Sequence, residues 1–208
     1  MPNYVSSGTE TVGKGTTLYT PWICYSGKVV VSSGGLVSSA DIYSGGREYV
    51  SAYGSDTDAY VYSNGGLEVL MSGTAVRPYV ISSSYISASG GRIFGGTVGK
   101  GGILTLKGYD TGSSVVSGYA SNLKIISGGS TDIAWKGVGA NVEVVSGNVT
   151  IYSGGTMQAS FIGSSAGDSR GAIVYVKTAG LADANYRTIS PCGLCHSRDP
   201  LTARWSSR

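Results

Sequence analysis

The chain has 208 residues, of which 34 are glycine and 41% are hydrophobic, and its 15 basic and 12 acidic side chains leave a net charge of +3. This near balance gives no electrostatic reason to expect a nucleic acid or an anionic membrane as partner. No run approaches the roughly 18 consecutive apolar residues of a membrane helix, so we expect no membrane-inserted segment. Valine and isoleucine, with many tyrosines, favour strands, and we predict an all-β protein.

A short apolar pair followed by serine and two glycines recurs along the chain. It is clearest at Ile42–Gly46, Ile126–Gly129 and Ile151–Gly155, with looser copies between them. Glycine adopts positive φ without a Cβ clash, so a glycine pair can turn the chain sharply between two strands. The spacing of the pairs is irregular, and single-glycine turns fill the longer gaps. We predict turns at Gly34, Gly35, Gly45, Gly46, Gly65, Gly66, Gly90, Gly91, Gly101, Gly102, Gly128, Gly129, Gly154 and Gly155.

Apolar and polar residues alternate after each predicted turn. Leu67, Val69 and Met71 fall on one face of an extended segment, and the residues between them fall on the other. A repeated unit of strand and turn is typical of a solenoid, in which each turn buries its apolar face against its neighbours. We expect about 20 residues per turn and roughly eight turns. The predicted β-helical domain spans residues 4–186.

Hairpins are the alternative use of glycine-rich turns. Asn64–Gly65 fits a two-residue hairpin loop, and a series of such hairpins would form a meander, a sandwich or a barrel. The same turn chemistry at nearly every strand end favours the solenoid, because a solenoid needs equivalent corners on each turn.

The repeated Val/Ile-x-Ser-Gly-Gly phrases, over roughly residues 4–166, resemble the repeats of AIDA-type autotransporter adhesins of Gram-negative bacteria. The resemblance implies a right-handed, single-stranded parallel β-helix displayed at the bacterial cell surface, as part of a larger exported protein. It implies an adhesive structural role without catalysis. The partner would be a host or sibling-cell surface that offers a protein or glycan ligand, and self-association stays open. Nothing in the sequence calls for a cofactor.

Residues 187–208 lack the serine–glycine repeats and carry the chain's excess of positive charge, and we expect a basic, irregular, poorly ordered tail. Cys192, Cys195 and His196 form the Cys-x-x-Cys-His pattern that attaches c-type haem. The alternatives are a local disulfide, an inert pair of thiols, or an accidental match in a changed reading frame. A zinc site would need two more ligands, so we predict no metal. We expect Cys24 to be buried.

A carbohydrate-active enzyme on a β-helix is the alternative to the adhesive role. Such an enzyme needs paired carboxylates on one face, and Asp56 and Asp58 share a strand face if the chain is extended there. We expect them instead to lie in a loop between turns. The other acidic residues that we considered occur singly, and we predict no catalytic residue.

Tyrosines offer the better lead to a binding surface. We predict that Tyr43, Tyr60, Tyr62 and Tyr152 line an outer face, where tyrosine supplies contact area at low entropic cost. The alternative is that stacked tyrosines only protect the sheet.

Overall fold

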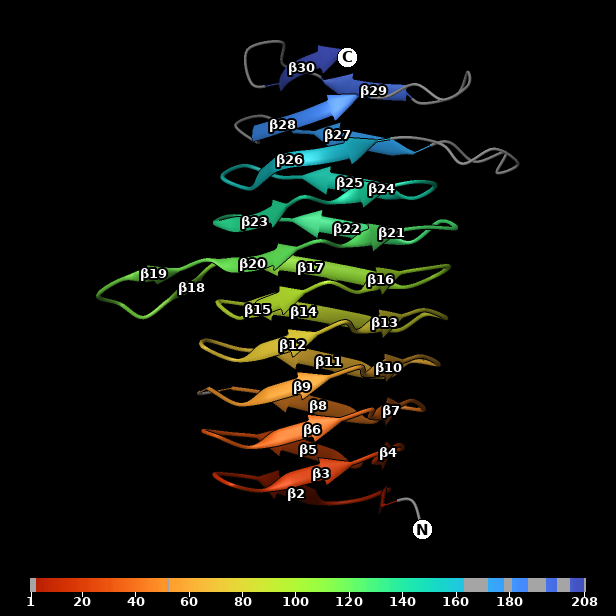
Figure 1. Cartoon of the computed structure of the whole chain (residues 1–208), viewed down its shortest axis with the longest axis vertical. Helices are drawn as coiled ribbons and strands as arrows, with labels where there is room; N and C mark the ends of the chain where they lie inside the picture. The colour runs from red at the N-terminus through yellow and green to blue at the C-terminus, as the bar shows by residue number, and fades with distance from the viewer. Residues whose placement is uncertain are drawn as a thin grey trace.

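A computed structural model of the chain describes residues 3–51, 53–162, 172–177, 181–186, 194–197 and 203–207. The chain rises in stacked turns from the N-terminus to the C-terminus (Figure 1). Each regular turn supplies one strand to a ten-stranded sheet and two shorter strands to an 18-stranded sheet.

The ten-stranded sheet forms one wall of the solenoid. Its strands are β2 (Thr9–Val12), β5 (Lys28–Val31), β8 (Arg47–Val50), β11 (Gly66–Val69), β14 (Tyr85–Ser89), β17 (Ile103–Lys107), β22 (Ser130–Ile133), β25 (Asn148–Ile151), β27 (Ile173–Val176) and β29 (Leu194–Ser197).

The 18-stranded sheet contains two columns of strands. The first column is β3 (Thr17–Tyr19), β6 (Leu36–Ser38), β9 (Ser55–Thr57), β12 (Thr74–Val76), β15 (Arg92–Phe94), β20 (Gly118–Ser121), β23 (Gly137–Ala140), β26 (Thr156–Ile162), β28 (Leu181–Tyr186) and β30 (Ala203–Ser207). The second column is β1 (Tyr4–Val5), β4 (Trp22–Ile23), β7 (Asp41–Ile42), β10 (Tyr60–Val61), β13 (Tyr79–Val80), β16 (Thr97–Val98), β21 (Lys124–Ile125) and β24 (Glu143–Val144).

Neighbouring strands of both sheets run parallel. Thr9 pairs with Lys28, Lys28 with Arg47, and Arg47 with Gly66, so successive partners are 19 residues apart. In Figure 1 the near strands run to the right and the far strands to the left as the chain rises, which makes the helix right-handed. The predicted all-β, right-handed parallel β-helix is confirmed.

The two glycines of a pair have different roles at a corner. Gly45 has a φ of +87°, in the left-handed region that favours glycine. Gly46 closes the same turn by donating its N–H to the Tyr43 carbonyl at 3.0 Å. A Cβ on Gly46 would lie 2.2 Å from the Ile23 carbonyl oxygen of the turn below. The first glycine therefore supplies a backbone conformation and the second permits close stacking.

The pair Gly65 and Gly66 departs from this scheme. Ser63 and Asn64 make the corner with φ values of +51° and +66°, and Gly65 takes the closely stacked position. Gly66 is the first residue of β11, where a Cβ would lie 2.6 Å from the Tyr85 ring. The prediction of a turn residue at Gly66 is therefore wrong, because the preceding Ser–Asn pair already supplies the positive φ values.

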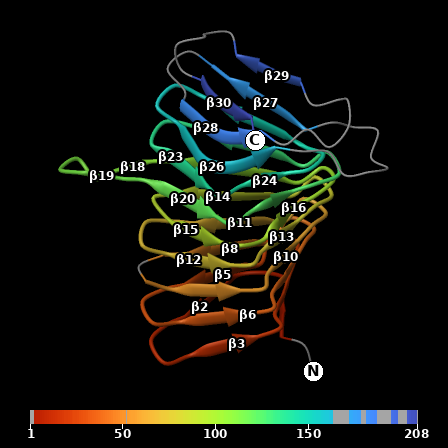
Figure 2. The ribbon, with the colours of Figure 1, turned by 45° about the horizontal axis from the view of Figure 1, so that its top comes forward.

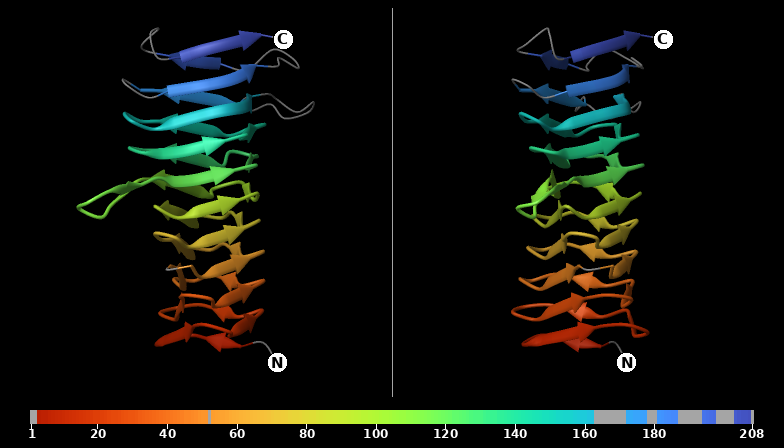
Figure 3. Two further views of the ribbon diagram at one scale, coloured as in Figure 1. Left: turned by 60° about the vertical axis from the view of Figure 1, so that its left-hand side comes forward. Right: turned by 90° about the vertical axis from the view of Figure 1, so that its left-hand side faces the viewer.

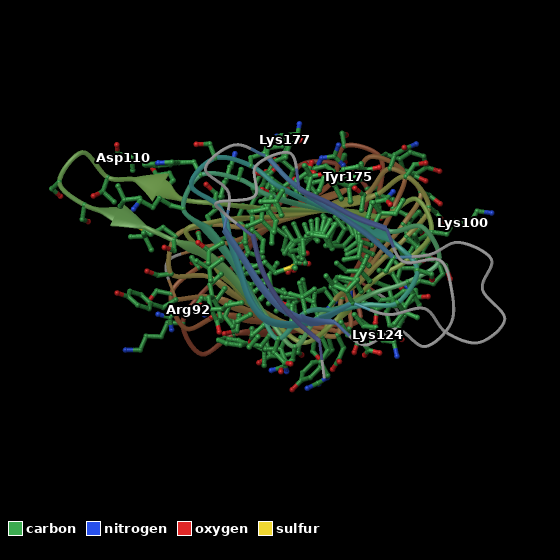
Figure 4. All side chains as sticks on the ribbon, turned by 90° about the horizontal axis from the view of Figure 1, so that it is seen from above. Arg92, Lys100, Asp110, Lys124, Tyr175 and Lys177 are labelled. Atoms are coloured by element: carbon green, nitrogen blue, oxygen red, sulfur yellow. The ribbon has the colours of Figure 1, made fainter. Side chains whose placement is uncertain are left out.

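The core is a narrow apolar stack between the two sheets. Alternation along each strand turns every second side chain inwards, as in β8 and β25. Seen from above, side chains project from the walls into the space between them (Figure 4). Cys24 is buried, as predicted. The largest fully buried side chains are Ile23, Ile42, Leu67, Ile86, Ile93, Leu104, Leu106, Ile125, Ile133, Ile151, Met157 and Ile162.

One hairpin interrupts the stack. Strands β18 (Tyr109–Asp110) and β19 (Val115–Val116) pair antiparallel with each other and stand out from the solenoid (Figures 2 and 3). Ile103 and its partner Ser130 are consequently 27 residues apart. The parallel pairing elsewhere in the described strands excludes the meander of hairpins.

Two strands lie within the predicted tail. β29 pairs in parallel with β27, and β30 pairs in parallel with β28. These backbone segments continue the two ladders of the solenoid. The predicted domain boundary between residues 186 and 187 stays a prediction.

Candidate binding surface

Aromatic side chains gather on the outer face of the short strands β1, β4, β7, β10 and β13. Register places Trp22 beside Asp41, Asp41 beside Tyr60, and Tyr60 beside Tyr79 on successive turns. The Ile or Val side chain at the second position of each of the strands β4, β7, β10 and β13 points inwards. We call the following residues the aromatic patch: Tyr4, Trp22, Tyr43, Tyr60, Tyr62 and Tyr79.

The rings of the aromatic patch pack along the solenoid axis in two groups, one of four rings from Tyr4 to Tyr62 and the pair Tyr60 and Tyr79. Centroids lie 5.1 Å apart for Tyr4 and Trp22, 6.1 Å for Trp22 and Tyr43, and 5.3 Å for Tyr43 and Tyr62. Those distances are typical of favourable aromatic pairs. Tyr4 nevertheless stays 62% exposed and Tyr60 51% exposed. The patch covers the sheet and also presents a large accessible surface.

A single carboxylate lies within this surface. The Tyr62 hydroxyl donates to Asp41 Oδ1 over a long 3.5 Å. Partial burial raises the pKa of Asp41 above its ordinary value, and the hydrogen bond from Tyr62 opposes that rise. The pKa of Tyr62 is raised in turn, by burial and then by the nearby Asp41 charge.

Three of the four tyrosines predicted to line an outer face lie together. Tyr43, Tyr60 and Tyr62 belong to the aromatic patch. Tyr152 follows β25 at another corner, where the Lys177 ammonium lies 4.3 Å from its ring centroid. The sequence pattern did not separate the two locations, because tyrosine occupies outward positions on several sides of the solenoid.

Asp56 and Asp58 do not form the paired site of a carbohydrate-active enzyme. Asp56 lies on β9 and is completely buried, so the expected loop position is wrong for it. Asp58 has a φ of +60°, which breaks the alternation of the strand and turns its side chain outwards. There it accepts hydrogen bonds of 2.8 and 2.7 Å from Arg77 Nε and Nη2. This ion pair holds the pKa of Asp58 below its ordinary value.

Glu48 is the buried acid that sequence reasoning missed. It lies on β8 between Val29 and Leu67 of the neighbouring turns, and its side chain is completely buried. The signal was its position: strand alternation after Gly46 places Glu48 and Val50 on the inward face.

Glu48 and Asp56 share the core, and their charges interact. None of their four carboxyl oxygens makes a hydrogen bond of normal geometry. Burial, followed by the charge of Asp56, raises the pKa of Glu48 well above its ordinary value. Burial, followed by the charge of Asp58, raises the pKa of Asp56 to about 8. Burial in the core therefore favours the neutral form of both groups, as expected for carboxyls in an apolar interior.

The haem-type motif falls largely outside the described residues. Cys192 lies outside them, and Cys195 and His196 are described only as backbone positions of β29. In the described part of the chain no three His, Cys, Asp or Glu residues come together as a metal site. That same part contains no helix long and apolar enough to span a membrane.

Comparison with known proteins identifies no family. The chain matches no protein-family model, and no curated protein is similar to it. Among solved structures it is similar to a crystallised TibA fragment that was hyper-glycosylated by TibC. The two chains are 21% identical, the alignment covers 99% of this chain and 98% of that one, and the TM-score is 0.38. The function is therefore inferred from this chain's own residues and geometry.

Proposed function

We propose that this chain is an adhesive, non-catalytic segment of a bacterial surface protein, and that the aromatic patch is its contact surface. The protein is an autotransporter-like passenger that holds the patch on a stiff solenoid away from the cell. Its partner is a molecule on a host cell or on a sibling cell.

The observation that carries this proposal is the exposure of the patch on a regular scaffold. Tyr4 and Tyr60 keep more than half of their surface accessible although they pack against other rings. Aromatic side chains dominate binding energy at protein surfaces because they bury much area and have few rotatable bonds. The repeated corners also suit an extended structural segment, because they add turns without changing the cross-section.

Replacing exposed patch tyrosines tests the proposal. We expect the double variant Tyr4→Thr and Tyr60→Thr to lose about tenfold in adhesion, because truncating an aromatic anchor typically costs more than about 1 kcal/mol. Threonine keeps the strand preference. The measurement is the adherence of beads coated with the full chain to epithelial monolayers and to bacterial cells.

Tyr175→Thr is the matched control, because Tyr175 is 42% exposed at a strand position of β27 in the ten-stranded sheet, outside the patch. Its adhesion should equal that of the unaltered chain. Equal losses in both variants, or no loss in the patch variant, would contradict the proposal.

A further inference from the structure

Asp41 lies in the aromatic patch without a cation beside it. The ion pairs within the described residues join Arg77 to Asp58 and Lys124 to Glu143, and neither includes Asp41. Its described hydrogen bond is the long one from Tyr62. The surface around Asp41 consists of electron-rich ring faces and hydroxyls, and it carries a negative charge when Asp41 is ionised.

The ten-stranded sheet shows a related arrangement together with a cation. The Tyr85 hydroxyl donates to Glu68 Oε1 at 2.9 Å, and the Arg47 guanidinium lies 5.2 Å from the centroid of the Tyr85 ring. Arg47 is held there by hydrogen bonds of 2.9 Å from Nη1 to the carbonyls of Gly46 and Asn64. The patch repeats the pairing of tyrosine hydroxyl and carboxylate through Tyr62 and Asp41, but it lacks the guanidinium.

We propose that the aromatic patch binds an arginine side chain presented by a partner protein, with the guanidinium placed between Asp41 and a neighbouring ring. This inference rests on the proposed adhesive function and names the chemistry of the partner. A guanidinium donates two parallel hydrogen bonds to a carboxylate and also stacks on an aromatic face, whereas an ammonium is a strongly hydrated point charge. Arginine therefore fits this surface better than lysine.

A neutral glycan fits the same surface less well. Sugar rings pack on exposed aromatic faces, but the planes of Tyr43 and Tyr62 are only 9° apart with their centroids 5.3 Å apart. Each of these two rings therefore covers part of one face of the other. The charge of Asp41, with no cation to balance it, adds a reason to expect a positive group.

The test uses the full chain and two small probes, N-acetylarginine amide and its uncharged analogue N-acetylcitrulline amide. We expect the arginine probe to shift the indole N–H signal of Trp22 saturably in the NMR spectrum, with a dissociation constant in the millimolar range. The citrulline probe should give no saturable shift. Asp41→Asn should weaken the arginine probe about tenfold, because a hydrogen bond to a charged group is lost.

The control variant is Glu143→Gln, which removes a half-exposed carboxylate outside the patch and should leave arginine binding unchanged. Equal binding of both probes overturns the inference, as does unchanged binding in Asp41→Asn. Saturable binding of a neutral oligosaccharide such as maltotriose, without arginine binding, assigns the patch to glycans instead. The comparison of the two probes on the unaltered chain still tests the inference if Asp41→Asn fails to fold.

The adhesion assay separates this inference from the proposed function. If the tyrosine double variant loses adhesion while Asp41→Asn keeps it, the contact surface stands and the arginine chemistry is wrong. If neither variant loses adhesion, the proposed function itself fails.

Discussion

Glu48 and Asp56 place two carboxylic acids where every neighbouring turn has an apolar side chain. Glu48 pairs with Val29 and Leu67, and Asp56 pairs with Val37 and Ala75. Buried carboxyl groups without hydrogen bonds destabilise a core, and neutralisation is the least costly state available to them. These residues make the stability of the N-terminal turns depend on pH.

The sign of this dependence follows from the raised pKa of Asp56. Above its ordinary value of 3.8 the unfolded chain releases a proton that the folded chain keeps up to about pH 8. The free energy of unfolding should therefore fall as pH rises from 5 to 8, by about 1.4 kcal/mol per pH unit for each retained proton. Urea denaturation followed by circular dichroism measures it, and a flat or rising profile would refute the assignment.

Removing the two acids should remove the slope. We expect the double variant Glu48→Leu and Asp56→Val to be more stable at pH 8 by a few kcal/mol, because each unpaired buried polar group costs about 1–3 kcal/mol. Both replacements match side chains found at these inward positions on neighbouring turns. Denaturation at pH 5 and pH 8 is the measurement, with Glu143→Gln as the control that keeps the slope.

At the scale of the structural element, glycine matters at the corners more because it has no Cβ to clash with the turn below than because it can adopt a positive φ. Positions equivalent to Gly46 recur on other turns as Gly65, Gly102 and Gly129. At each of these three a Cβ would lie 2.2 Å from a carbonyl oxygen of the turn below. Ser84 takes this position on one turn, and its hydroxyl donates to the carbonyls of Val61 and Ile81. A side chain is thus accepted at this corner where it can hydrogen-bond to those carbonyls.

An alanine side chain in place of Gly46 has no hydroxyl that could hydrogen-bond to the carbonyls of the corner. We expect Gly46→Ala to lower the free energy of unfolding by about 2–4 kcal/mol, because backbone must shift to relieve the contact with Ile23. Gly13→Ala is the matched control, since the nearest atom to its added Cβ is Ser32 Oγ at 3.8 Å. Thermal unfolding compares the two, and equal stability would show that the corner tolerates a side chain.

At the scale of the whole molecule, the solenoid keeps one register across a large insertion. Thr9, Lys28, Arg47 and Gly66 follow each other every 19 residues, and the ladder resumes beyond the hairpin when Ile103 pairs with Ser130. Each turn contacts chiefly its neighbours, so an excursion at one corner leaves the other turns unchanged. Figure 3 shows the hairpin outside an otherwise continuous stack.

Deletion of residues 109–116 tests this independence. The deletion joins Gly108 to Ser117, a corner as short as Met71–Ser72 two turns earlier. We expect the free energy of unfolding to change by less than about 1 kcal/mol, because β18 and β19 pair only with each other. Circular dichroism and urea denaturation provide the measurement. Loss of the folded state would show that the hairpin supports the turns around it.

The sequence by itself determined the class of fold and the inward positions. Val and Ile at alternate positions between glycine corners predict strands with one buried face, and that physics is local to each segment. The same alternation also places Glu48 at a buried, inward position. The period of 19 was hidden, because each turn has more than one corner and the hairpin lengthens one turn.

Only the tertiary structure decided which residues meet. Trp22, Asp41 and Tyr60 become neighbours because parallel pairing stacks residues one full turn apart. The separation of Asp56 from Asp58 follows from a single positive φ at Asp58, which local composition does not specify. Stacking register and backbone twist are collective properties of many turns, so the aromatic patch and the buried acid pair emerge only when those turns are assembled.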